Sequence, residues 1–204
     1  EQINAKLYDT AMDRVNYWHL QPDAEVQKLQ ETYSIFSSDV ECDVTYHSQY
    51  LMSVSYKEIY APINPVWYVY MTQRALTVDL LTGESYALKD VLRLNEDFVL
   101  LWVDKFNEKL GKKMIASEDV DIFFDWFNCS DKELEDYYIF VPYFYVTEEG
   151  NFVIGVSLDP KTAAISGRDP SNSTFYTEFT AEEIAPYRTE SVFWDRYDKS
   201  ESTG

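Results

Sequence analysis

Apolar and polar residues alternate through much of residues 33–88, and this feature most limits how the chain can fold. Val40, Cys42, Val44 and Tyr46 are each separated by one polar residue, which is the period of a strand with two unlike faces. Further strand-type segments follow after short breaks, at residues 51–60, 66–80 and 85–88. The pattern predicts a meander of antiparallel strands joined by short turns.

Helical periodicity is present on both sides of this meander. Over residues 2–18, apolar side chains recur every three or four positions, at Ile3, Leu7, Ala11, Val15 and Trp18. Asn95 predicts the start of a helix over residues 96–110, because its side-chain oxygen can accept the unpaired amide hydrogens of the first turn. The apolar face of that helix consists of Phe98, Leu101, Trp102, Phe106 and Leu110. We therefore expect Trp102 to be buried, and Gly111 to end the helix.

The second half of the chain contains signals for one more helix and a hairpin. Ser117 predicts the start of a helix that runs to about residue 128, and Ser130–Glu133 fits a capping box. Residues 139–146 and 152–158 flank a turn in which Gly150 can adopt a positive φ, which predicts a hairpin. Residues 159–174 are rich in turn formers and predict a surface excursion before a last strand at 175–179.

Together these elements predict an α+β fold, a twisted antiparallel β-sheet with helices packed on one face. Aromatic residues make up 17% of the chain, which supplies enough apolar surface for a packed core. Because no repeat, linker or low-complexity segment interrupts the chain, we expect residues 1–197 to form a single extracytoplasmic domain. The polar residues 198–204 are expected to form a disordered tail.

The charge balance limits the class of partner. The 17 Lys and Arg residues against 36 Asp and Glu residues give a net charge of -19. Such a field repels the phosphates of nucleic acids and anionic membrane surfaces, and it attracts cationic partners. No stretch approaches the roughly 20 apolar residues of a membrane span, so we expect no membrane insertion within this segment. The charge could equally serve solubility alone.

Residues that commonly carry catalysis are scarce. His19 and His47 are the only histidines, and on a strand His47 and Cys42 would point to opposite faces. The six glycines are scattered and form no phosphate-binding loop. We therefore expect no enzyme activity, no catalytic residue, no metal site and no cofactor. Cys42 and Cys129 match no zinc or redox spacing, and they could be two unpaired, buried cysteines or a disulfide of an oxidising compartment.

Two acidic groups and several aromatic clusters leave alternatives open. The acidic groups are Asp119, Asp121 and Asp125, and then Asp159, Asp169, Asn172 and Glu178. The first could serve glycoside hydrolysis or solvate the outer face of a helix, and the second could bind calcium. The aromatic clusters are Trp67, Tyr68 and Tyr70, Tyr137 and Tyr138, and Tyr143, Phe144 and Tyr145. They could form a platform for sugar or protein, although the core is the more common place for such rings on strands.

Four segments, in this order, resemble a known family. They are Gln2-Ile3-Asn4-Ala5, the strand Tyr50–Tyr56, the segment Leu76–Glu84 that continues into Ala87–Leu92, and Glu182–Tyr187. Together they resemble the extracytoplasmic domain shared by the anti-sigma factor RsiV and the N-terminal part of the deacetylase PdaC. The chain departs from the family pattern where Arg188-Thr189-Glu190 replaces a glycine and where residues 159–174 look inserted.

The resemblance implies a binding domain rather than an enzyme. In RsiV the domain binds lysozyme, and in PdaC the deacetylase chemistry belongs to a separate metal-binding domain. The expectation is a non-catalytic extracytoplasmic binding or sensor domain of a bacterial cell-surface protein, either secreted or anchored through a segment absent from this chain. Its partner would be a cationic protein such as lysozyme, and its binding residues stay unknown at this stage. The alternative is a cell-wall carbohydrate-binding or accessory module whose partner is a cell-wall glycan.

Overall fold

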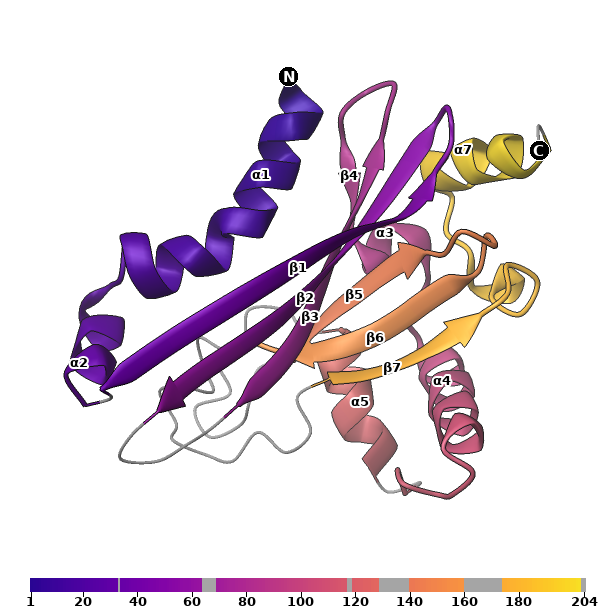
Figure 1. Cartoon of the computed structure of the whole chain (residues 1–204). Helices are drawn as coiled ribbons and strands as arrows, with labels where there is room; N and C mark the ends of the chain where they lie inside the picture. The colour runs from indigo at the N-terminus through magenta and orange to yellow at the C-terminus, as the bar shows by residue number, and fades with distance from the viewer. Residues whose placement is uncertain (33, 64–68, 117–118, 129–139, 160–173, 203–204) are drawn as a thin grey trace.

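The structure is a computed structural model that describes residues 1–32, 34–63, 69–116, 119–128, 140–159 and 174–202 (Figure 1). In chain order the elements are α1 (Gln2–Val15), η1 (Asn16–Leu20), α2 (Ala24–Thr32), β1 (Ile35–His47), β2 (Leu51–Ile63), β3 (Tyr70–Asp79), β4 (Ser85–Tyr86), α3 (Leu88–Val91), α4 (Glu96–Lys109), α5 (Val120–Phe127), β5 (Phe140–Val146), β6 (Phe152–Leu158), β7 (Thr174–Phe179), η3 (Ala185–Tyr187) and α7 (Val192–Glu201).

The strands form two antiparallel sheets. One sheet has the order β1-β2-β3-β4 and the other has the order β5-β6-β7. The predicted α+β class with antiparallel strands is confirmed, but the strands divide between two sheets instead of forming one. Helices also cover more than one face: α1 lies against β1 and β3, whereas α4 and α5 lie against β7 and β5.

The burial of β6 explains this layering. All seven residues of β6 are buried, because one face of its sheet meets β3 and the other lies under the helices. A strand that is apolar on both faces needs cover on both sides. Trp102 on α4 supplies part of that cover, since it is 0% exposed and its ring N–H donates to the Ile154 carbonyl at 2.9 Å. The prediction that Trp102 is buried is confirmed.

Local signals in the sequence set the ends of several elements. The Asn95 side chain accepts a hydrogen bond from the Phe98 amide at 3.0 Å, as the cap predicts. Gly111 follows α4 with φ +63°, and Gly150 closes the β5–β6 turn with φ +81°. Ser117 and residues 130–133, which we expected to cap helices, lie outside the described residues, and α5 begins at Val120.

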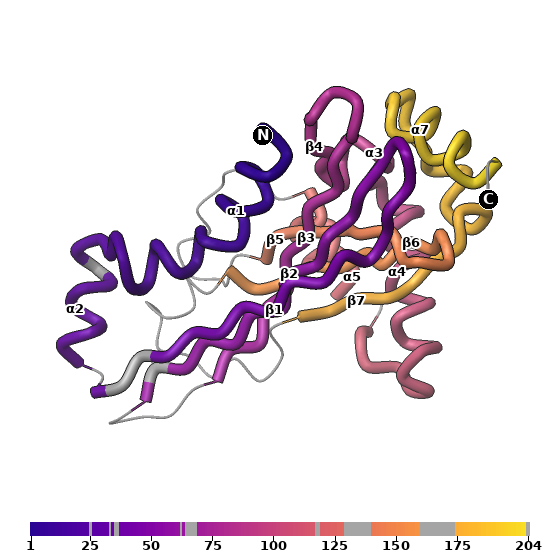
Figure 2. Tube along the Cα trace, turned by 45° about the horizontal axis from the view of Figure 1, so that its top comes forward, coloured from indigo at the N-terminus to yellow at the C-terminus, as the bar shows by residue number. Residues whose placement is uncertain are grey.

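The four-stranded sheet continues past the second sheet. Figure 2 shows the α2 end of β1–β3 extending beyond the ends of β5–β7. We call this end of the four-stranded sheet the ribbon. It comprises residues 37–43 of β1, 55–61 of β2 and 70–74 of β3, and its β3 edge still contacts β6 and β7. Because β1 is an edge strand, its expected core positions are open: Cys42 is exposed, and Val44 is 62% exposed. The expectation of a buried Cys42 is wrong for this reason, and Cys129 lies outside the described residues.

Both ends of the described chain are ordered against the sheet. At the N-terminus, α1 continues as the π-helical turn η1, which places Trp18 in a stack on Tyr60 with ring centroids 4.2 Å apart. At the C-terminus, α7 runs to Glu201, and the buried Ser200 hydroxyl lies 2.8 Å from that of Ser48. The helix therefore continues through the first four residues of the segment expected to be a disordered tail, while residues 203–204 lie outside the described part.

Candidate functional site

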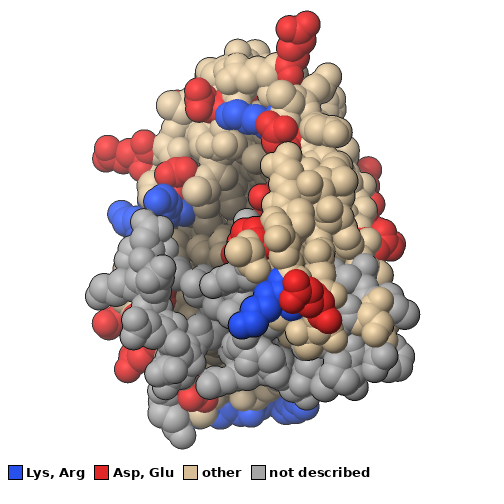
Figure 3. Space-filling view, turned by 90° about the vertical axis from the view of Figure 1, so that its left-hand side faces the viewer, with Lys and Arg blue, Asp and Glu red and all other residues tan. Residues whose placement is uncertain are grey.

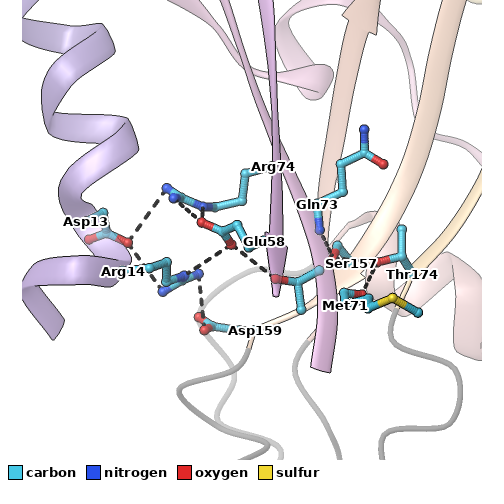
Figure 4. Close-up of polar contacts among 10 residues, drawn as sticks. Asp13, Arg14, Glu58, Met71, Gln73, Arg74, Ser157, Asp159 and Thr174 are labelled. Atoms are coloured by element: carbon cyan, nitrogen blue, oxygen red, sulfur yellow. Dashed lines mark hydrogen bonds and ion pairs between the residues drawn. The ribbon is translucent and has the colours of Figure 1, made fainter. Parts of the chain in front are cut away.

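A network of buried charges joins α1 to the ribbon (Figure 4). Glu58 on β2 is 4% exposed and forms ion pairs with both Arg74 on β3 and Arg14 on α1. Arg14 is 8% exposed, and its guanidinium also lies 3.2 Å from Asp159 and 3.3 Å from Asp13. These five side chains carry two positive and three negative charges. The network is therefore nearly neutral inside and fixes the position of α1 on the sheet.

The sequence carries a signal for this network that the search for motifs missed. Arg14 lies four residues before the buried Trp18, so the two side chains share one face of the helix. Glu58 lies between Tyr56 and Tyr60 in the alternation of β2, where an apolar residue would be expected. Arg14 and Glu58 each interrupt an apolar pattern and carry opposite charges. Because a buried charge needs a partner, the two residues are candidates for an ion pair.

Gln73 lies where the two sheets meet. Its backbone amide donates to the Ser157 hydroxyl at 2.8 Å, and its side-chain oxygen accepts a hydrogen bond from Tyr143 at 3.3 Å. Two residues earlier, the Met71 carbonyl accepts a hydrogen bond from Thr174 at 3.1 Å. At Met71 and Gln73, before β4 pairs with β3, the outer edge of β3 is thus satisfied by side chains of β6 and β7. Gln73 itself is buried, with 9% of its surface exposed.

An acid-rimmed groove lies on the ribbon beside β7. It has a volume of about 240 Å³ and is lined by Asp39, Glu41, Lys57, Glu58, Ile59, Met71, Thr72, Gln73, Thr174 and Tyr176. We call it the acidic groove. Its apolar residues are unusually open, since Ile59 is 46%, Met71 64% and Tyr176 40% exposed. The strand register places Glu41, Lys57 and Gln73 in one row across the three strands, and Asp39, Ile59 and Met71 in the next.

The charge at this groove is mostly uncompensated. Lys57 lies 3.4 Å from Asp43, whereas Asp39 and Glu41 have no ion-pair partner among the described residues. Tyr176 already accepts one cation, because the Lys109 ammonium lies 3.7 Å from its ring centroid. An apolar floor with a carboxylate rim suits the side chain of lysine or arginine, whose stem is apolar and whose head is charged.

A second, larger hollow lies between β3–β4 and β5. Its volume is about 680 Å³, and it is lined by Ala75, Leu76, Ser85, Tyr86, Ala87, Leu88, Lys89, Asp90, Leu94, Phe127, Asn128, Val141, Pro142, Tyr143 and Phe144. This size is within the range of small-molecule sites. Desolvation and then the hydrogen bond to Asp79 raise the pKa of Tyr86 to about 12, so its hydroxyl remains a neutral hydrogen-bonding group.

The structure keeps apart the residues that sequence reasoning considered for chemistry. His19 is exposed and lies 2.6 Å from the Ser38 hydroxyl, whereas His47 is exposed at the other end of β1. His47 lies nine positions after Ser38 on β1, a distance of about 30 Å along the strand. Desolvation and the neighbouring Asp43 both raise the pKa of the Cys42 thiol, which opposes formation of a nucleophilic thiolate. Among the described residues, no group of His, Cys, Asp and Glu is arranged to hold a metal ion.

The remaining acidic candidates have structural contacts. Asp121 and Asp125 are exposed on α5, and Asp119 lies at its start. Asp159 is paired with Arg14, and Glu178 accepts a hydrogen bond from Asn151 at 2.8 Å. Asp169 and Asn172 lie outside the described residues, so the calcium alternative stays a hypothesis.

The aromatic clusters expected from the sequence lie partly in the core and partly outside the described residues. Tyr70, Tyr143 and Phe144 are buried in the core, and Tyr145 is half-buried. None of these four is as exposed as Tyr176, which is 40% exposed. Trp67, Tyr68, Tyr137 and Tyr138 lie outside the described residues.

Comparison with known proteins supports the fold. No family model matches the chain, and no curated protein matches it either. Among solved structures, the chain is similar to a member of the DUF3298 family from Bacteroides fragilis, with a TM-score of 0.50 and 10% sequence identity. The similarity covers 96% of this chain and 72% of that one. At this identity it shows a fold of the DUF3298 type and nothing about activity. Within the described parts of the chain, every helix is too short or too polar to cross a membrane.

Proposed function

We propose that this domain is a non-catalytic recognition domain of a bacterial cell-surface protein, and that it binds a cationic protein outside the cytoplasm. The observation that carries the proposal is the acidic groove, where open apolar side chains lie beside Asp39 and Glu41, which have no ion-pair partner within the described ranges of the chain. The net charge of -19 means that the whole molecule, and not only the groove, attracts cationic proteins. Figure 3 shows the side on which α2 lies, where acidic side chains outnumber basic ones among the coloured residues and the surface is hollowed in its middle.

The resemblance to the domain of RsiV suggests lysozyme as the first protein to test, because lysozyme is strongly basic. The DUF3298-type fold is compatible with this choice but does not select it. Extracytoplasmic location and surface anchoring are parts of the proposal that follow from the same resemblance.

The test is a titration of the immobilised domain with lysozyme at increasing salt. Electrostatic steering raises the association rate at low salt, and it declines as the screening length falls from about 10 Å at 0.1 M to about 3 Å at 1 M salt. We expect tight binding that survives physiological salt, with the salt dependence in the association rate. A second basic protein of similar size and charge serves as the control. Equal, weak, salt-sensitive binding of both would mean that the surface is merely acidic, and would refute the proposal.

The large hollow favours one alternative, a module that binds cell-wall glycan. Tyr86 among its lining residues is half-buried and offers ring surface and a hydroxyl group of the kind that sugars contact. A neutral chitooligosaccharide added in the same assay separates the two functions, because its binding should hardly respond to salt. Salt-independent sugar binding that Tyr86→Ala removes, together with no lysozyme signal, would establish the glycan module instead.

A further inference from the structure

We infer that β1 binds an extended basic segment of its partner as an additional strand of the sheet. This inference rests on the proposed function and specifies how the partner is held. β1 is the edge strand of the four-stranded sheet, and its residues 41–44 are all exposed. An edge strand presents unpaired backbone N–H and C=O groups along its length, and an extended peptide can pair with them.

The side chains of β1 specify which peptide would fit. Asp39, Glu41 and Asp43 lie on one face of the strand, and Val40, Cys42 and Val44 lie on the other. A partner strand that alternates basic and apolar residues would set its basic side chains beside the carboxylates and its apolar side chains beside Val44. On the acidic face, a lysine or arginine stem could lie across Asp39 and Glu41, at the β1 side of the acidic groove.

The same charges exclude a second copy of this chain as the occupant. Two β1 strands paired edge to edge would bring their acidic residues together, and like charges on neighbouring strands are destabilising. Charges on an edge are a known protection against self-association. Here they also favour a strand of opposite charge, because among the three carboxylates on this face of β1 only Asp43 has a lysine partner in the part of the chain that the structure describes.

The irregularity of β1 marks where the docking segment would end. The β1–β2 register shifts between Val44 and Tyr46, which breaks the ladder at that point. Tyr46 beyond it is buried, and its hydroxyl donates to Glu201 on α7 at 3.0 Å. The accessible edge is therefore the part of β1 before Thr45.

The test uses a capped peptide in which lysine and valine alternate. Its control has the same composition with the lysines in one block, so that charge is equal and only the alternation differs. We expect the alternating peptide to bind at least about tenfold more tightly, which corresponds to about 1.4 kcal/mol. Two further peptides carry N-methyl groups on the backbone nitrogens of either the valines or the lysines. Because these nitrogens face opposite edges of a strand, methylation of one set should abolish binding.

Protein variants locate the site. Asp39→Asn with Glu41→Gln should weaken binding of the alternating peptide at least about tenfold, whereas Asp121→Asn with Asp125→Asn on α5 changes the net charge equally and should weaken it less than about twofold. Amide hydrogen exchange at saturating peptide should slow within residues 39–44. Equal binding of the alternating and block peptides, tolerance of both methylated forms, or equal effects of the two double variants would each overturn the inference. Specific lysozyme binding by the wild-type domain, together with equal binding of the alternating and block peptides, would leave the proposed function intact and refute this mode alone.

Discussion

The aromatic half of the molecule and the ribbon are held together by different forces. Around α4, α5 and β6, rings contact rings, as where Trp102 stacks on Phe106 with centroids 5.2 Å apart. The ribbon has ring contacts too, such as the stack of Trp18 on Tyr60, but it adds buried charged and polar contacts: Glu58 pairs with two arginines, and Gln73 and Ser157 join the two sheets. Apolar burial is non-directional and tolerant, whereas buried charges demand defined partners. The aromatic half therefore supplies stability, and the ribbon supplies a fixed, charged surface for recognition.

The largest effect is expected in the aromatic half. Trp102→Ala should lower the free energy of unfolding by about 4 kcal/mol, because it removes a fully buried ring and leaves the Ile154 carbonyl without its donor. Urea denaturation measures this change. Leu100→Ala on the same helix is the control, since Leu100 is 45% exposed and its loss should cost less than about 1 kcal/mol. Similar losses for the two variants would show that α4 does not contribute to the core as described.

The second largest loss of stability is expected when the buried charge network is disrupted. Glu58→Gln should cost about 3 kcal/mol, because two arginines lose the carboxylate between them while Arg14 stays buried. The matched control is Glu41→Gln on the neighbouring strand, which makes the same chemical change at an exposed position. The difference between the two variants in denaturant unfolding isolates the effect of burial. If Glu58→Gln were as mild as its control, the ribbon would not depend on this network.

The contrast between the halves also shows what sequence can predict. The strand period, the Asn95 cap and the glycines at positions 111 and 150 are local signals, and each predicted its element because the physics acts within a few residues. The division into two sheets is not local. It depends on whether β5 pairs with the first four strands or packs over them, and alternation of residues looks the same in both cases.

The residues of the candidate site likewise could not be predicted from local sequence signals. Asp39 and Glu41 were visible only as two of many acidic residues, and their role depends on β1 lying at a sheet edge and on β7 lining the far side of the same groove. The network could have been suspected from Arg14 and Glu58, each an exception in an apolar pattern. Pairing them requires α1 to lie on β2 and β3, which no spacing in the sequence specifies.

A pH experiment examines the junction between the halves. Asp79 at the end of β3 is 1% exposed, and Arg196 on α7 donates to it at 2.9 Å. Burial would raise the pKa of Asp79, but hydrogen bonds from Arg196, from two backbone amides and from Tyr86 outweigh it and lower the pKa below the usual 3.8. A depressed carboxyl pKa stabilises the fold above the unfolded pKa, and this contribution is lost as pH falls through the folded value.

Asp79→Asn should therefore cost about 2 kcal/mol at neutral pH and progressively less below about pH 4. Denaturant unfolding of both proteins across that range gives the two curves. Glu183→Gln is the comparison, because the Lys105 hydrogen bond also lowers the pKa of Glu183 but the pair lies at the surface, where solvent screens it. A constant difference between wild type and Asp79→Asn down to low pH would show that Asp79 is not held ionised by the fold.

The smallest effect on stability is expected at the acidic groove. Asp39→Asn with Glu41→Gln should change the free energy of unfolding by less than about 0.5 kcal/mol, because neither carboxylate has an ion-pair partner among the described residues and both are exposed. The same double variant should slow the association of lysozyme at low salt, since it removes two charges from the region that meets the partner. Thermal unfolding and association rates measured on one preparation give both quantities. A marked loss of stability would mean that these carboxylates support the ribbon, and the groove could then no longer be regarded as a surface kept free for a partner.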